Sequence, residues 1–171
     1  AADVYKRQTK NGANAAILTA PDSIAWLLNI RGGDLPFTPV ALGFAILFSS
    51  SNVQLFMDPR KLLKKTKEFL EETVSLRPVE EFQSALQELG KTKTVVQFSS
   101  SNGPCWIMNQ LQRAGAKVLN VEDPCILPKA CKNSVELQGM RNSHIRDGVA
   151  LCKFFSWLTK NLLTREIDEA L

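Results

Sequence analysis

Short apolar runs alternate with amphipathic segments through most of the chain, and this alternation constrains the fold more than any other feature of the sequence. Each run has the length of one β-strand and is flanked by turn-forming residues. We expect strands at residues 15–18, 40–48, 53–57, 74–76, 94–98 and 117–121. Strands that alternate with helices are typical of an α/β domain. Because only the polar residues 49–52 separate the second run from the third, the sequence also predicts a β-hairpin, and hence a mixed sheet.

Helical spacing of apolar residues fills the gaps between the expected strands. Asp22 is expected to cap a helix over residues 23–28, and Pro78 to begin a helix that Gly90 ends. A third helix is expected from Pro104 to Ala114. Residues 60–72 are also expected to be helical, because five of their side chains share one helical face: Leu62, Leu63, Thr66, Phe69 and Leu70.

The sequence changes character after Pro128. Asn133 and Glu136 have the spacing of a capping box, and a helical pattern much longer than any before it follows as far as Leu162. A last segment begins at Thr164 but has too few apolar residues to form a core. We therefore expect residues 1–131 to form one domain and residues 132–171 to be the opening helices of a second, truncated one.

Composition and charge exclude several classes of protein. With 44% apolar and 22% charged residues over 171 positions, the chain is globular rather than disordered and is long enough for one core. A net charge of +4, with no aromatic residues interleaved among the basic ones, argues against a nucleic-acid surface. No apolar run approaches the roughly 20 residues of a membrane span, and no signal peptide is visible. The first residue is Ala1 rather than Met, so we expect an excised piece of a longer protein.

The residues that could carry chemistry do not form a recognisable active site. The four cysteines, Cys105, Cys125, Cys131 and Cys152, lack metal-ligand spacing, and we expect reduced thiols in a cytoplasmic protein. The single histidine, His144, lies on an apolar helical stripe, where a structural role is the more common one. We find no paired carboxylates, no nucleophile with its base and no metal cluster, so the residues alone predict neither a catalytic residue nor a metal site.

Two basic or polar segments leave an alternative open. Arg60, Lys61, Lys64, Lys65 and Lys67 form a basic helical face. Residues 99–103 form a Ser-rich loop before a helix, where free backbone N–H groups can hold an anion. The chain could therefore be a stand-alone α/β module that binds an anionic partner. A solvated helix surface and an ordinary loop are the simpler interpretations of the two segments.

The loop over residues 29–34 is the most informative segment. Its glycines, Gly32 and Gly33, permit a positive φ, and Asn29, Arg31 and Asp34 bring polar and charged groups into one tight bend. We expect an ion pair between Arg31 and Asp34 that fixes the loop against a neighbouring element; recognition of one end of a substrate is the functional alternative.

Three stretches carry a resemblance to a known family. DSIAWLLNIRGGDLPFTPV at residues 22–40 resembles the pattern D-x-I-A-W-L-x-N-h-R-G-x-D-h-x-x-x-P-V in the middle domain of aminopeptidase P (Xaa-Pro aminopeptidase), with Gly33 where Ser is commoner. KNSVELQGMRNSHIRDGVALCKFFSWL at residues 132–158 resembles the first helix of that family's pita-bread catalytic domain. TREID at residues 164–168 resembles the next helix, apart from the inserted Arg165.

The resemblance implies a creatinase/prolidase N-terminal-like fold, with a mixed sheet flanked by helices, for the first domain. It implies that the parent enzyme removes an N-terminal residue preceding proline, using a dinuclear metal centre, usually manganese. The ligands of this metal centre are expected C-terminal to Leu171. A further domain is expected before Ala1. The piece itself is then a non-catalytic scaffold and gating part. Its implied partners are the parent enzyme's own catalytic domain, peptides with proline at the second position, and the other subunits of a homo-oligomer. Asn29, Arg31 and Asp34 are the implied contact with the catalytic domain.

Overall fold

The computed structural model describes residues 2–164 of the 171-residue chain. The chain divides into two compact units, Ala1–Ala130 and Cys131–Leu171, and each is described by itself. The final segment expected from Thr164 onward lies outside the described residues, so its packing stays a prediction.

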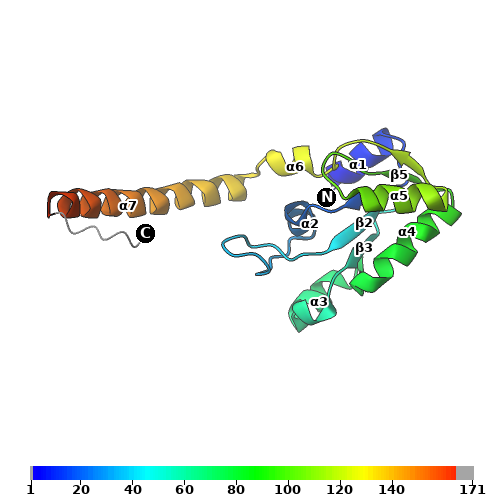
Figure 1. Ribbon diagram of the computed structural model, residues 1–171, viewed down its shortest axis with the longest axis horizontal. Coiled ribbons are helices and arrows are strands. Elements are labelled where there is room, and N and C mark those ends of the chain that lie inside the picture. The colour runs from blue at the N-terminus through cyan, green and yellow to red at the C-terminus, as the bar shows by residue number, and fades with distance from the viewer. Residues whose placement is uncertain (1, 165–171) are drawn as a thin grey trace. The chain divides into compact units, whose positions relative to one another are not determined.

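The first unit is built on a six-stranded mixed sheet in the order β4-β3-β2-β1-β5-β6 (Figure 1). The strands are β1 (Ala15–Leu18), β2 (Phe44–Phe48), β3 (Val53–Phe56), β4 (Val74–Arg77), β5 (Val95–Gln97) and β6 (Lys117–Leu119). The pairs β1–β2 and β2–β3 are antiparallel, whereas β3–β4, β1–β5 and β5–β6 are parallel. The predicted α/β fold with a hairpin in a mixed sheet is therefore confirmed.

Helices cover both faces of this sheet and bury a separate apolar cluster on each. The elements are α1 (Ala2–Lys10), α2 (Pro21–Leu28), η1 (Pro59–Lys61), α3 (Lys64–Leu70), η2 (Val79–Glu81), α4 (Phe82–Lys91), α5 (Cys105–Ala114) and α6 (Ile126–Ala130). Side chains of α1, α2 and α3 pack on one face, against Ala16 and Leu47 among others. Those of α4 and α5 pack on the other, against Ile17 and Ile46. Successive strand residues thus face opposite layers, so β1 and β2 are buried on both sides.

Two predicted elements differ markedly from the observed ones. The strand expected at residues 40–48 begins only at Phe44, because the preceding residues pair within a loop. The helix expected at residues 60–72 is broken into η1 and α3, because Leu62 and Leu63 have extended backbones. Helical spacing alone overestimated its apolar face: Leu63 is 76% exposed and Phe69 is 61% exposed.

Caps and short helices account for the other differences. Asp22 does not cap α2: Pro21 opens the helix after Ala20, whose side chain makes no capping bond, and Asp22 lies in the first turn. Gly90 does not end α4, which continues to Lys91. Helices α1 and α6 were not predicted, since α1 is mostly polar and buries little besides Val4 and Gln8.

The second unit contains α7 (Ser134–Thr164), the long helix that the sequence predicts. The expected capping box is present: the Asn133 N–H donates to Glu136 Oε2 at 2.9 Å, and the Glu136 N–H donates to Asn133 Oδ1 at 2.9 Å. His144 is exposed on this helix. Large apolar side chains are exposed along it, among them Phe154, whose ring lies 5.6 Å from that of Phe155 and 6.2 Å from that of Trp157.

Candidate functional site

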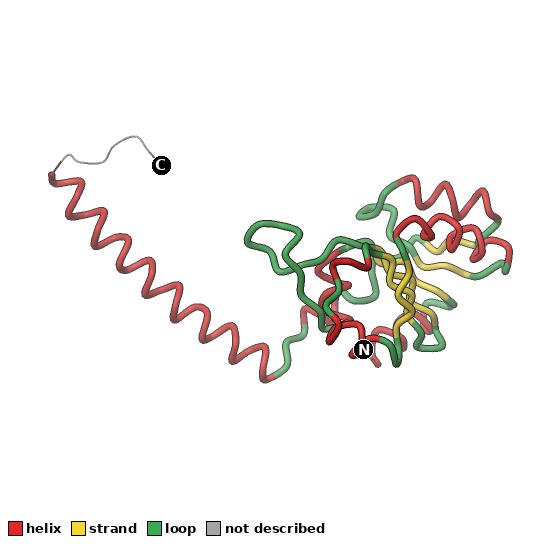
Figure 2. The backbone as a smooth tube through the Cα atoms, turned by 90° about the horizontal axis from the view of Figure 1, so that it is seen from below, coloured by secondary structure: helices red, strands yellow, loops and turns green. Residues whose placement is uncertain are grey.

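The strongest candidate surface is the 29–43 loop, defined as the residues between α2 and β2, which extends away from the sheet (Figure 2). It begins where Asn29 takes a left-handed conformation, with φ 52° and ψ 40°, and ends α2. The Ile30 N–H then donates to Ala25 O at 3.0 Å, and the Ile30 side chain is buried in the core. Asn29 therefore sets the direction in which the loop leaves the fold.

Arg31 fastens the start of the loop to the end of α2. Its guanidinium Nη1 donates to Ala25 O at 3.1 Å and to Ile30 O at 2.8 Å. A cation beside the last carbonyl groups of a helix is favourable, because their dipoles leave partial negative charge there. Arg31 thus holds the loop by backbone contacts.

Asp34 makes different contacts, so the expected Arg31–Asp34 pair is wrong. Asp34 Oδ2 accepts a hydrogen bond from the Leu42 N–H at 2.7 Å and lies 2.5 Å from the Lys61 Nζ. The hydrogen bond from Lys61, followed by that from Leu42, holds the pKa of the Asp34 carboxyl below its ordinary value. The carboxylate therefore ties the two arms of the loop to each other and to η1.

Gly32 and Gly33 have unequal roles in the loop, and neither has the positive φ that the sequence suggested. A Cβ on Gly32 would lie 2.6 Å from the Ala41 Cβ and 2.7 Å from the Ala41 N. A Cβ on Gly33 would meet no atom within 4 Å. Gly32 is therefore needed for the close approach of the two arms, whereas Gly33 is replaceable.

The tip of the loop is a tight turn that presents an aromatic ring to solvent. The Thr38 N–H donates to Leu35 O at 3.3 Å, with Pro36 and Phe37 between them. Phe37 has φ 60°, and proline followed by a positive φ is the pattern of a type II turn. The exposed area of Phe37 is 107% of its reference value, so the ring makes no contact that offsets the free-energy cost of the strained backbone. Sequence reasoning missed this residue because Pro36 signals a turn without giving its type.

An apolar hollow of about 460 Å³ lies at the base of the same loop. Its apolar lining comes from Pro21, Leu42, Phe44, Met57 and Val79. Asp58 and Lys61 also line it, but both are already paired, Asp58 with Arg60 and Lys61 with Asp34. Because its charged groups are satisfied, the hollow favours an uncharged apolar group.

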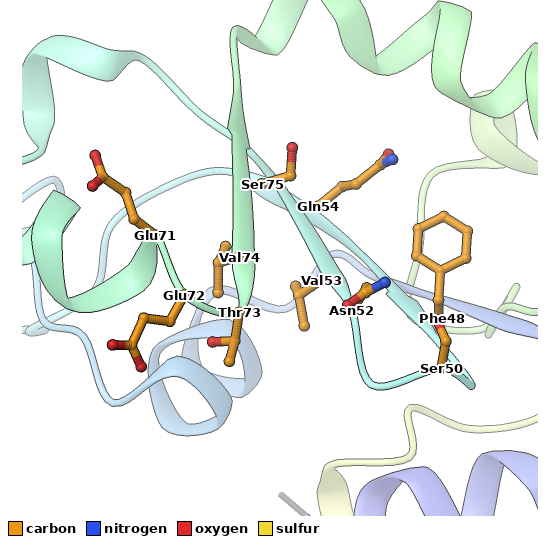
Figure 3. Close-up of a pocket in the computed structure, with 10 residues that line it drawn as sticks. All are labelled: Phe48, Ser50, Asn52, Val53, Gln54, Glu71, Glu72, Thr73, Val74 and Ser75. Carbon is orange, nitrogen blue, oxygen red and sulfur yellow. The ribbon is translucent and has the colours of Figure 1, made fainter.

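A second hollow, of about 600 Å³, lies at the β3–β4 edge of the sheet (Figure 3). Figure 3 shows the side chains of Glu71 and Glu72 pointing away from those of Gln54 and Ser75. Binding sites bring their few polar groups together on one ligand. The divergent side chains here give no such arrangement, so this hollow is not a candidate site.

The segments proposed for an anionic partner are partly engaged within the fold. Arg60 pairs with Asp58 at 2.6 Å, Lys61 with Asp34 and Lys64 with Glu68 at 3.9 Å. In the 99–103 loop, both the N–H and the hydroxyl of Ser100 bond to the Asn120 side chain.

Within residues 2–164, no three or more His, Cys, Asp or Glu side chains lie together in a way that could hold a metal ion. The four cysteines are all free thiols. Over the same residues, no helix is both long and apolar enough to cross a lipid bilayer.

Comparison with known proteins gives this fold a family. Residues 1–136 match the Creatinase/Prolidase N-terminal domain. The chain belongs to this family. The fold that the motif at residues 22–40 implied is thereby confirmed, and the family match extends past the sheet to the first turn of α7.

The chain is homologous over nearly its whole length to part of Xaa-Pro aminopeptidase P. It is 37% identical over 170 residues to the probable Xaa-Pro aminopeptidase P of Coccidioides posadasii strain RMSCC 757 / Silveira, covering 96% of this chain and 28% of that protein. It is 34% identical over 176 residues to the probable enzyme of Phaeosphaeria nodorum, covering 98% of this chain and 27% of that protein. The chain therefore spans less than a third of the length of these relatives.

Comparison with solved structures gives the same family relationship. The chain superposes on the X-prolyl aminopeptidase of Caenorhabditis elegans, described as a cytosolic enzyme with a di-nuclear active site, with a TM-score of 0.83 and 30% identity. That match covers 95% of this chain and 27% of the nematode protein. The Xaa-Pro dipeptidase of Bacillus anthracis, with a TM-score of 0.59 and 12% identity, shares the fold alone, over 80% of this chain and 37% of that protein.

Proposed function

We propose that this chain is a non-catalytic scaffold and gating part of a longer Xaa-Pro aminopeptidase, an enzyme that releases an N-terminal residue preceding proline. The observation that carries the proposal is the alignment of 96% of the chain with only 28% of a probable Xaa-Pro aminopeptidase P. The scaffold role is supported by the rigidly anchored 29–43 loop, whose tip projects into solvent.

The proposal places the metal chemistry outside these residues. The nematode relative is described as having a di-nuclear active site. The donor set of residues 2–164 does not fit such a centre, because it contains no cluster of metal-ligating side chains. We therefore propose that the metal pair, with manganese as the expected metal, is held by the rest of the longer protein.

The domain division of the sequence analysis is part of the same proposal. Residues 1–131 form the creatinase/prolidase N-terminal-like domain, and residues 132–171 open the pita-bread catalytic domain. The exposed apolar side chains of α7, such as Phe155 and Leu162, support this division, because exposed apolar surface of this kind marks a contact with a further part of a protein. Asn29, Arg31 and Asp34 are the residues that set the loop against the catalytic domain.

Location, assembly and substrate are also part of the proposal. We propose a cytoplasmic enzyme, since the nematode relative is described as cytosolic and all four cysteines of this chain are free thiols. We also propose that the longer protein forms a homo-oligomer and acts on peptides with proline at the second position.

Hydrolysis of an Xaa-Pro peptide tests the proposal directly. The 171-residue chain and a chain extended past Leu171 are assayed with added Mn²⁺. The proposal predicts that only the extended chain hydrolyses the peptide. Turnover by the 171 residues would overturn the non-catalytic role, and an inactive extended chain would overturn the assignment to an aminopeptidase. Salt-sensitive binding of phosphate or nucleic acid by the 171-residue chain would instead support the anion-binding module.

A further inference from the structure

We propose that Phe37 is the anchor of an interface in which the tip of the 29–43 loop enters an apolar pocket in the remaining part of the longer polypeptide. This inference rests on the proposed function and adds to it a residue that carries the contact, together with the chemistry of the surface that receives it.

The first step of the argument is the cost of the turn. The second central position of a type II turn is favourable for glycine or asparagine, because they tolerate a positive φ. Phe37 occupies that position with φ 60°, where a bulky side chain is strained. Its ring contributes nothing to the core that would offset the strain, since it is fully exposed. A strained backbone that presents a ring to solvent is consistent with a contact that this chain alone does not make.

The second step is the rigidity of the support. Arg31 holds the first arm of the loop to α2, and Asp34 joins both arms to Lys61. The arms also bond to each other, through the Asp34 N–H to Val40 O at 3.2 Å. A ring held on a fixed support loses little conformational entropy on binding, so it suits an interface anchor.

The third step identifies the occupant. Leu35 and Leu42 are each more than two-fifths exposed on the same loop, and Leu42 lines the apolar hollow. The surface therefore combines a protruding ring with a recess, and its partner must offer an apolar pocket and an apolar projection. More than two-thirds of the length of the relatives lies outside this chain. A covalently attached partner meets the loop at high effective concentration, which favours it over a second copy.

The substitution Phe37→Asn distinguishes the effect of backbone strain from the effect of losing the aromatic contact. Asparagine tolerates the left-handed backbone but removes the ring. In the 171-residue chain, the melting temperature should stay unchanged or rise by about 2 °C. In the extended chain, the same substitution should lower the melting temperature by about 4 °C or more, because the interface loses its anchor. Phe37→Leu keeps both the strain and an apolar side chain, and should retain most of the stability of the extended chain.

The results of these measurements distinguish the possible partners of the loop tip. A response of the same sign in both chains would overturn the inference. A concentration-dependent dimer of the 171-residue chain that Phe37→Asn dissociates, followed by sedimentation velocity, would assign the pocket to a second copy and also overturn it. Peptide hydrolysis by the unsubstituted extended chain is measured separately. Failure of the aminopeptidase assignment is thereby distinguished from failure of the Phe37 contact.

Discussion

The Nζ of Lys61 lies 2.5 Å from Oδ2 of Asp34, and this ion pair joins the 29–43 loop to η1, which follows β3. The same carboxylate oxygen accepts the Leu42 N–H from the returning arm of the loop. The shape of the loop is thus determined within this chain, by contacts with its own elements.

Asp34→Asn should loosen the loop while leaving the core intact. The amide keeps an acceptor for the Leu42 N–H but loses the charge that attracts Lys61. We expect faster hydrogen exchange at Leu42 and Asp34 and little change in melting temperature, measured by NMR and by thermal denaturation. Asp3→Asn, which removes an exposed pair with Lys6, is the matched control and should leave exchange in the loop unchanged.

The same ion pair should give the loop a pH dependence. Since the pKa of Asp34 is lowered in the folded chain, the pair stabilises the loop fully above the ordinary pKa of about 3.9 for aspartate. Its contribution should be lost as the pH falls through the lowered folded pKa. Exchange at Leu42, corrected for its intrinsic pH dependence, should therefore accelerate only below about pH 4. Acceleration centred near pH 6 would point to another group.

Gly32→Ala should destabilise the chain, and Gly33→Ala should not. A Cβ at Gly32 would collide with the backbone of Ala41, and relieving such an overlap costs about 1–3 kcal/mol. The neighbouring position has open space and no positive φ. Urea denaturation of both variants measures the difference. Equal stability of the two would mean that the arms of the loop do not approach each other as described.

Gly90→Ala should disrupt the contact between α4 and α5, which lie side by side in Figure 1. An added Cβ would lie 2.3 Å from the Ala114 Cβ and 2.4 Å from its carbonyl oxygen. We expect a loss of about 2 kcal/mol or more in the free energy of unfolding, because backbone must move to make room. Gly139→Ala provides the contrast, since that helical glycine of α7 has open space, and alanine should favour its helix by about 1 kcal/mol. Far-UV circular dichroism during urea denaturation follows both variants.

The sequence predicted those features that local patterns determine. Strand β1 was predicted with its observed bounds, because a four-residue apolar run between polar segments has few alternatives. The capping box at Asn133 was predicted because both of its partners lie within one helical turn. The family motif at residues 22–40 located the loop that became the candidate surface.

Features that depend on distant partners were not predictable in this way. Arg31 and Asp34 are close in sequence and opposite in charge, yet Arg31 binds the backbone carbonyls of Ala25 and Ile30, and Asp34 binds Lys61, which lies 27 positions away. Gly90 was interpreted through its backbone freedom, whereas its role is to admit Ala114 from the next helix. Such long-range contacts leave no periodic signal in the sequence.

Amide hydrogen exchange over residues 34–42, compared between the 171-residue chain and the chain extended past Leu171, tests most directly whether the rest of the longer protein covers this loop. The account predicts that exchange in the extended chain is slower by about tenfold or more, with the largest effect next to Phe37. Equal exchange rates in the two chains would contradict it.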